Sequence, residues 1–549
     1  MSHGSSTTTT SHAPSYSSLT GTGMLLRFML RRDRIRTLAW VAGIGVMGFY
    51  FAQAVQVIAE DPESLTSLAG LYADPVGRMM IGPGYGMDAP TFERFFASGY
   101  ALYIYLLIAL CSVFTVVRHT RAEEQTGRAE LVRANMVGRH ATLTSAVLLT
   151  TAINGVAAVL VWVAALTAGY AMHGSLLVAA GGLAVGLFFM GATAVAAQLT
   201  ESSRGASAFA GGLLGLAFVV RMAGDMAEFG GSALSWFSPL AWAQQTAPFV
   251  YDRWWPLLFL VAGAVVFTAL GFWLSTRRDL GASLMPTRLG RREAQPWLGT
   301  PLGLATHTLR GGLRGWGIAL VLVAFMFGSY AQTMLEAGDS LPAELSQIFA
   351  GEDLMVGYMS YMALFIAVFV AAASVSSLQQ IRGEEHRGRA EYALSVPTHR
   401  TTWFGAHLAV VIVGVFVMLE LVGLGMGVGA VLTVEHDAGQ YFGQLFVASV
   451  MQAPAVLATV GIVTLLLGWL PRAAAGIGWL IVGFAGVMST FGGLLELPQF
   501  VIDLNVFGHL AEYPVEDIAW APVLMLTAIG VAALLVGLVG FNRRELNRV

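Results

Sequence analysis

Long apolar runs separated by short charged segments form the pattern of this chain. Twelve runs are about as long as the roughly 18 to 20 residues that a helix needs to cross a bilayer. They lie at 37–59, 95–117, 141–171, 176–198, 207–223, 254–275, 315–336, 355–380, 403–433, 442–469, 475–492 and 521–541. The pattern predicts an all-α polytopic membrane protein with about twelve transmembrane helices.

Two charged stretches interrupt the apolar pattern and resemble each other. Residues 121–130 read Arg-Ala-Glu-Glu-Gln-Thr-Gly-Arg-Ala-Glu, and residues 382–391 read Arg-Gly-Glu-Glu-His-Arg-Gly-Arg-Ala-Glu. Seven of the ten positions are identical at an offset of 261 residues. We call these stretches the first island and the second island. Each follows the second predicted span of its half, which indicates two parallel six-helix repeats related by an axis along the membrane normal.

Polar segments divide the chain into five parts. Residues 1–23 are rich in Ser and Thr and lack the basic and apolar regions of a signal peptide, so we expect a disordered tail. Residues 24–36 combine apolar side chains with five Arg, which predicts an amphipathic helix on the cytoplasmic membrane surface or simple positive flanking of the first span. Residues 37–275 and 307–549 form the two halves, and 276–306 a cytoplasmic linker.

Composition agrees with a membrane protein and argues against several kinds of site. Charged residues make up 11% of the chain, against roughly a quarter in soluble domains. All 30 basic residues are Arg, so the chain lacks the Lys of a Walker A phosphate loop. The single Cys111 excludes an intrachain disulfide framework. We therefore expect no catalytic, nucleotide-binding or metal site and no cofactor on this chain.

The placement of Arg predicts the orientation. If both termini are cytoplasmic, 26 of the 30 Arg lie on the inner side. The other four fall on or near the outer side: Arg78, Arg94, Arg221 and Arg253. Basic residues accumulate in cytoplasmic segments of membrane proteins. We predict a multi-pass protein with both termini and both islands in the cytoplasm.

Both islands contain acidic residues that a plain cytoplasmic loop does not need. Glu124 precedes Arg128 by four residues and Glu385 precedes Arg389 by four, the favourable order for an ion pair on a helix. Gly127 permits a sharp turn, as does the equivalent Gly in the second island. Positive flanking explains the Arg but not three Glu in each island. The pattern favours a docking surface, with a solvated loop as the alternative.

Six spans per half, a leading amphipathic helix and a Glu-Glu-x-x-Gly-Arg-x-Glu segment between spans 2 and 3 resemble the permeases of ABC type-two exporters. Over residues 24–546 the chain is similar to the double-length actinobacterial form, which exports polyketide antibiotics such as tetronasin or multiple drugs. The resemblance implies a type V-like fold in the bacterial plasma membrane. It also implies two copies of a separate ABC subunit that binds ATP and Mg.

In that family the segment after span 2 is a coupling helix that docks on the ATP-binding subunit. The resemblance therefore implies ten docking residues: Glu123, Glu124, Gly127, Arg128, Glu130, Glu384, Glu385, Gly388, Arg389 and Glu391. It further implies short re-entrant helices within 224–253, a segment whose tryptophans are also typical of an interfacial aromatic belt.

Glu420 lies near the middle of a predicted span. An ionisable residue at that depth is unfavourable and usually faces a cavity or a partner. It indicates contact with a cationic substrate or a proton site, with Met418 as a second candidate for the substrate pathway; a protonated Glu bonded to a neighbouring helix is the alternative. Close helix packing is favoured by the series Gly423, Gly425, Gly427 and Gly429.

Two functions fit these observations. The first is the permease subunit of an ATP-driven ABC exporter that moves apolar or amphipathic compounds (drugs, antibiotics or lipids) out of the cytoplasm, in contact with membrane lipids and without nucleic acid. The alternative is a proton-coupled secondary multidrug transporter with Glu420 as proton carrier. The islands favour the first. The outer loops 60–94 and 337–354 either gate or cap the pathway.

Overall fold

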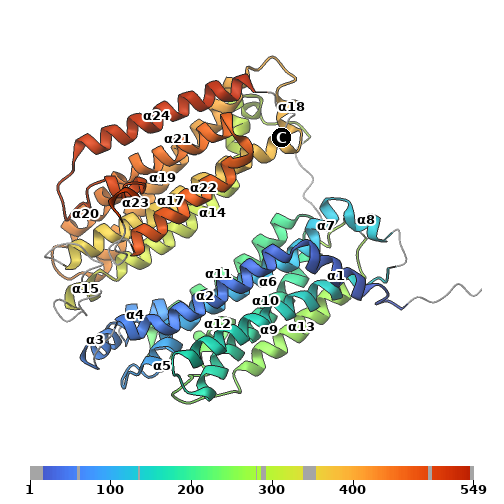
Figure 1. Cartoon of the computed structure of the whole chain (residues 1–549), viewed down its shortest axis with the longest axis vertical. Coiled ribbons are helices and arrows are strands. Elements are labelled where there is room, and N and C mark those ends of the chain that lie inside the picture. Colours follow the sequence, from blue (N-terminus) through green and yellow to red (C-terminus); the bar gives the residue numbers. More distant parts are fainter. Residues whose placement is uncertain are drawn as a thin grey trace, which may run out of the picture. The chain divides into compact units, whose positions relative to one another are not determined.

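The computed structural model describes residues 17–58, 62–73, 75–133, 137–279, 281–285, 292–337, 354–491 and 498–544. Their regular secondary structure is helical throughout and contains no β-strand. The long helices of each half lie side by side as a bundle (Figure 1). The predicted all-α class is therefore confirmed, whereas most of the predicted tail and most of loop 337–354 lie outside the described residues.

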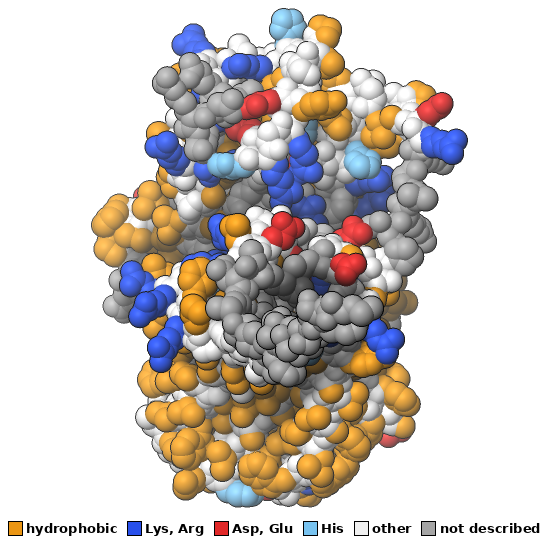
Figure 2. Space-filling view, turned by 90° about the vertical axis from the view of Figure 1, so that its right-hand side faces the viewer, with side chains coloured by type: hydrophobic (Ala, Val, Ile, Leu, Met, Phe, Trp, Pro, Cys, Tyr) orange, Lys and Arg blue, Asp and Glu red, His pale blue; other side chains and the backbone are white. Residues whose placement is uncertain are grey.

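The described residues contain 12 stretches that are long and apolar enough to cross a membrane, as predicted. They are Arg34–Gln56, Phe92–Gln125, Ala141–Thr167, Met172–Leu199, Ser203–Ala227, Leu257–Ser275, Pro301–Ser329, Met355–His386, Arg400–Thr433, Ala438–Trp469, Pro471–Ser489 and Trp520–Arg543. Figure 2 shows hydrophobic side chains over wide areas of the surface and charged ones gathered in fewer places. This is the distribution expected of helices that face lipid.

The chain forms two compact units, Met1–Leu289 and Gly290–Val549. The long helices of the first unit are α1 (Thr22–Arg32), α2 (Arg34–Ile58), α6 (Ala101–His119), α9 (Ala141–Thr167), α10 (Met172–Leu199), α11 (Ser203–Ala227) and α13 (Leu257–Ser275). Helix α6 continues from α5 (Phe92–Phe95) and a π-helical turn, η1 (Phe96–Tyr100). In the segment between α2 and α5 lie α3 (Pro62–Ala73) and α4 (Pro75–Ile81).

Helix α10 forms the core of the first unit. It packs against α6, α9 and α13, and most of its residues are buried. Its glycines allow this close approach, because a Cβ at Gly186 would lie 2.6 Å from the side-chain nitrogen of Asn154. Asn154 donates to Ser112 on α6 at 2.8 Å. Small residues and buried hydrogen bonds thus hold the helices together where lipid gives no hydrophobic driving force between them.

The second unit repeats this organisation with different helix bounds. Its long helices are α14 (Pro301–Ser329), α17 (Leu354–His386), α19 (Arg400–Thr433), α20 (Ala438–Met451), α21 (Ala453–Trp469), α22 (Pro471–Phe491) and α24 (Trp520–Arg543). Helices α20 and α21 form one candidate span with an interruption at Gln452. Shorter helices are α15 (Ala331–Ala337), α18 (Arg389–Ala393), α23 (Gln499–Ile502) and η5 (Val506–His509).

The glycine series on α19 packs helices as predicted. A Cβ at Gly427 would meet the ring of Phe442 on α20, and a Cβ at Gly429 would meet the carbonyl oxygen of Phe325 on α14. Gly423 and α20 repeat the first contact one turn earlier. Alternate glycines therefore face alternate neighbours, which confirms the packing role of this series.

The two units begin differently from the prediction. In the first unit, α1 ends at Arg32 and α2 starts at Arg34, with Asp33 between them. In the second unit α14 is continuous and begins at Pro301, inside the predicted linker and 14 residues before the predicted span at 315. Thr300 accepts a hydrogen bond from the Gly303 N–H and Pro301 is the first helical residue. These two start signals extend the helix into the polar segment.

Two short helices precede α13, namely η2 (Ser235–Phe237) and α12 (Pro239–Gln244). Ser238 caps α12 by accepting the N–H of Ala241. Trp236 stacks on Trp255 with 5.1 Å between the ring centroids. Short helices are present here, as the resemblance implied, and they also carry the aromatic residues; their depth in a membrane stays a prediction.

Candidate functional site

Each island folds as a helix, a glycine turn and a second short helix. In the first island these are α7 (Arg121–Gln125), Gly127 with φ of 72°, and α8 (Arg128–Arg133). In the second island α17 continues to His386, Gly388 has φ of 70°, and α18 follows. The left-handed conformation favours glycine.

The glycine turn separates the residues that were predicted to form ion pairs. Helical i,i+4 contacts need a continuous helix, and the chain changes direction between Glu124 and Arg128. In both islands the predicted pair is absent among the described residues, and the second Glu pairs instead with an Arg far along the chain. The predicted Glu124–Arg128 and Glu385–Arg389 pairs were therefore wrong.

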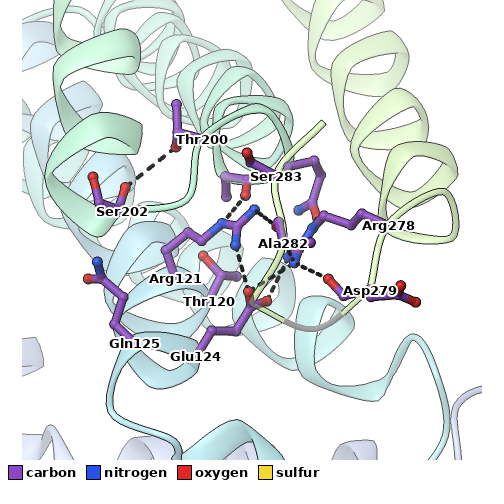
Figure 3. Close-up of polar contacts among 12 residues, drawn as sticks. Thr120, Arg121, Glu124, Gln125, Thr200, Ser202, Arg278, Asp279, Ala282 and Ser283 are labelled. Carbon is purple, nitrogen blue, oxygen red and sulfur yellow. Dashed lines mark hydrogen bonds and ion pairs between the residues drawn. The ribbon is translucent and has the colours of Figure 1, made fainter. Parts of the chain in front are cut away.

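Glu124 binds two arginines in the first unit (Figure 3). Arg278, just after α13, donates to both carboxylate oxygens at 2.6 and 2.9 Å. Arg121 donates to the same carboxylate at 2.8 Å. All three side chains are at most 11% exposed. This bidentate geometry at a buried place is the strong form of a charge-assisted hydrogen bond.

The two arginines also bind the end of α10 and the chain that follows α13. Arg121 donates to the carbonyl oxygens of Ala197 and Ala282, and Arg278 donates to the side chain of Gln198 at 2.7 Å. The N–H groups of Leu284 and Met285 reach two carbonyls at the end of α10, each at 3.2 Å. Carbonyls that the end of α10 leaves unpaired are thus satisfied by Arg121 and by the chain after α13.

The neighbours of Glu124 tie α7 to two further helices. Glu123 accepts from Arg32 at the end of α1 at 2.8 Å. Gln125 accepts from the hydroxyl and the N–H of Ser203, at the start of α11, at 2.7 and 3.1 Å. Three consecutive side chains of the first island are therefore used inside its own unit.

Asp33 lies at the elbow between α1 and α2 and joins it to the end of α6. Arg118 donates to both of its oxygens, one at 2.6 Å, and His119 Nε2 lies 3.2 Å from it. The hydrogen bond from Arg118 lowers the pKa of Asp33 below its usual value, with the charges of Arg118, His119 and Arg32 adding to it and burial opposing it.

Glu385 forms the corresponding contact in the second unit. Arg544, just after α24, places one nitrogen 2.7 Å from each carboxylate oxygen. Nε and Nη1 of Arg544 are buried without a partner among the described residues, and so is Nε of Arg382, the equivalent of Arg121. Glu384 pairs with the half-exposed Arg389 across the glycine turn.

The two units thus share one contact, which we call the island clamp: Glu124–Arg278 in the first and Glu385–Arg544 in the second. In each unit it joins the end of the second span to the residues that end or directly follow the last span. The clamp acids are separated by 261 residues, and the clamp arginines follow equivalent last spans. The duplication therefore includes a tertiary contact as well as a sequence.

The charged residues of each island that follow the glycine turn are exposed. Arg128 and Glu130 are exposed in the first island, and Leu131, which directly follows it, is 71% exposed. Arg389 and Glu391 are exposed in the second island, and Tyr392, which directly follows it, is 84% exposed. Of the ten predicted docking residues, Gly127 and Gly388 form the turns. The charged residues fall into two groups: an inner side, whose glutamates bind other helices of the same unit, and an outer side after the turn, whose residues are exposed.

A cavity of about 610 Å³ lies beside the second island, within the second unit. Its walls come from α14, the end of α17, α18 and the start of α19. Arg389 and Tyr392 line it together with Trp403. The second island therefore presents a concave surface.

The two candidate pathway residues do not share a surface. Glu420 is exposed on α19 and has no hydrogen-bond or ion-pair partner among the described residues. Met418 is buried and faces Gly317 of α14. The alternative of a Glu bonded to a neighbouring helix therefore finds no partner in the described part of the second unit.

The sequence pattern missed Arg121, Asp33 and the partners of the island glutamates. The sequence reads Arg-Arg-Asp-Leu at 277–280, after span 6, and Arg-Arg-Glu-Leu at 543–546, after span 12, and this repeat makes Arg278 and Arg544 equivalent. It did not say what they contact, because their partners lie more than 150 residues away in the chain. No group of His, Cys, Asp and Glu among the described residues is arranged to hold a metal ion.

Comparisons with known proteins match this architecture over nearly its full length. The family described as "Multidrug efflux system permease Rv1217c, C-terminal domain" matches residues 24–274 and 298–542, one segment in each unit. The "Multidrug efflux system permease protein Rv1217c" of Mycobacterium tuberculosis (strain ATCC 25618 / H37Rv) is 33% identical over 534 residues, covering 96% of this chain and 96% of that protein. With its twelve candidate spans, the chain belongs to this family of double-length actinobacterial multidrug efflux permeases.

Proposed function

We propose that this permease is the membrane subunit of an ATP-driven exporter, with one copy of a separate ATP-binding subunit docked at each island. The observation that carries the proposal is the repeated island. It stands at the end of the second span in both units, with the same glycine turn, the same clamp to the last span and, after the turn, the same exposed Arg and Glu. Two equivalent surfaces on one chain suit two copies of one partner.

The absence of Lys supports a division of labour between chains. A Walker A loop uses Lys on the nucleotide phosphates, and all 30 basic residues of this chain are Arg. ATP and Mg are therefore assigned to the partner and none to this chain. Both termini and both islands are assigned to the cytoplasm, where the partner finds its nucleotide.

The proposed cargo is apolar or amphipathic, such as drugs, antibiotics or lipids. The matched family is described as a multidrug efflux permease, and the spans supply mostly apolar surface. Glu420 is the candidate contact for cationic cargo, because an exposed carboxylate on a span is unfavourable against lipid and suits a polar path.

The test is reconstitution with and without the partner. The tagged chain is purified in mild detergent, its Walker A-containing partner is identified, and both are placed in liposomes with a lipophilic cationic dye. We expect dye movement only with the partner and Mg-ATP, and no ATP hydrolysis by the chain alone. Saturable hydrolysis by the pure chain, or transport that needs no partner, would overturn the proposal.

A variant of Glu420 distinguishes the proposed exporter from the alternative, a proton-coupled secondary transporter. If it carries protons, Glu420→Gln abolishes all transport together with its dependence on a proton gradient. If it contacts cargo, Glu420→Gln weakens transport of cationic dyes more than that of neutral ones and leaves ATP dependence intact. Leu419→Met, a change of similar volume at a buried position of the same helix, is the control.

A further inference from the structure

A large apolar side chain directly follows each island. Leu131 is 71% exposed and Tyr392 is 84% exposed. They are separated by 261 residues, the offset of the islands, and each directly follows an exposed Glu. Residue identity differs between the two, but exposure and apolar character are kept.

The glutamates that bind other helices of their own unit cannot at the same time bind the ATP-binding subunit. The side chains of Glu124 and Glu385 are only 11% and 5% exposed in the island clamps, and Glu123 is bound to α1. A buried bidentate ion pair leaves few free acceptor sites on the carboxylate. The surface available to another protein therefore consists of the exposed side chains after each glycine turn.

We infer that the partner is held chiefly by Leu131 and Tyr392, with the neighbouring charges as a polar rim and the inner glutamates as intramolecular positioning residues. This inference rests on the proposed ATP-binding partner. Binding energy at protein interfaces concentrates in a few large, well-buried side chains surrounded by polar residues. Tyr392 with Arg389 and Glu391 has this composition, because Tyr and Arg are enriched among such side chains. Leu131 with Arg128 and Glu130 provides the equivalent apolar position after the first island.

A lipid surface is the other kind of occupant for an exposed apolar residue. Beside these side chains one exposed Arg and one exposed Glu stand together, Arg128 with Glu130 and Arg389 with Glu391. An anionic membrane surface attracts clusters of basic residues, and these mixed pairs do not form such a cluster. Tyr392 also borders the cavity of about 610 Å³ that Trp403 helps to line. A concave site next to an aromatic residue suits a protein side chain, so the observations favour a protein partner.

The first experiment truncates both anchors in the full chain. Leu131→Ala combined with Tyr392→Ala should weaken binding of the purified ATP-binding subunit about tenfold or more, without lowering the melting temperature, because both side chains are exposed. Val396→Ala is the matched control, since Val396 is 57% exposed close to Tyr392 but outside the repeated positions. Unchanged binding by the double variant overturns the inference. If the wild-type chain binds no Walker A protein, the proposed function itself has failed.

Crosslinking provides a second readout that does not depend on affinity. The chain has a single cysteine, Cys111, and it is buried. Leu131→Cys and Tyr392→Cys therefore each add the accessible thiol to which a photoreactive probe can be attached. We expect crosslinks to the ATP-binding subunit from both positions and none from Val396→Cys. Crosslinks to lipid alone in nanodiscs that contain the partner would overturn the inference.

Discussion

The two island clamps use the same residue types in different surroundings. In the first unit two arginines face one glutamate, and their remaining donors reach Gln198 and the carbonyls of Ala197 and Ala282. In the second unit Arg544 alone faces Glu385, with two of its nitrogens buried and unpaired among the described residues. The first clamp is part of a closed network, and the second is an isolated pair.

This difference shows that both repeats contain the clamp, but in the described part of the chain only the first surrounds it with further hydrogen-bond acceptors. In the first unit the chain after α13 lies along the end of α10 and supplies acceptors to both arginines. Unsatisfied buried donors are unfavourable. The first island is therefore expected to be held more rigidly than the second, and the following variants test that comparison.

Loss of the clamp acid should produce the largest effects. Glu124→Gln leaves Arg121 and Arg278 buried with no carboxylate, whereas Glu385→Gln leaves one such arginine. Removing one partner of a buried ion pair costs about 3 to 5 kcal/mol. We expect both variants to lower the melting temperature in detergent, with Glu124→Gln the more severe. Equal melting temperatures for both variants and the wild type would contradict the clamp.

Exchanging the acid and the arginine within each clamp should have different effects on the melting temperature in the two units. Glu385→Arg combined with Arg544→Glu keeps an isolated pair and should regain most of the lost melting temperature. Glu124→Arg combined with Arg278→Glu puts a positive charge at position 124, where Arg121 now binds a carboxylate, and should regain little. Equal rescue in both units would show that the surrounding network does not matter.

The sequence predicted the helical class, the number of spans and the islands, because these depend on local composition and on similarity between two segments. It did not predict the contacts of the islands. Glu124 and Arg128 fit a helical ion pair by spacing, yet the glycine turn separates them. The true partner, Arg278, is brought close by packing of α13 against α10, which no local pattern records. The start of α14 was missed because Thr300 and Pro301 outweigh the polar residues that follow.

Replacing the equivalent arginines at the start of the islands, Arg121 and Arg382, should change the melting temperature less than loss of the clamp acids does. Arg121 has a fully buried side chain and donates to two carbonyls and Glu124. The side chain of Arg382 forms no hydrogen bond or ion pair among the described residues. Since a hydrogen bond to a charged group contributes about 1.5 to 3 kcal/mol, Arg121→Leu should destabilise clearly and Arg382→Leu hardly. Melting in detergent measures both, and the reverse order would contradict the network.

The smallest expected effect concerns the elbow at Asp33, which the continuous α14 of the second unit lacks. The pKa of Asp33 is lower in the folded protein than in the unfolded chain, where it is about 3.9. A carboxyl with a lowered folded pKa contributes stability above the unfolded pKa and loses it as pH falls through the folded pKa. Asp33→Asn should therefore melt below the wild type at pH 7, and the gap should narrow below about pH 4. Asp503→Asn, at an exposed position of the second unit, is the control. A gap that stays constant down to pH 3 would show that Asp33 acts through shape and not through charge.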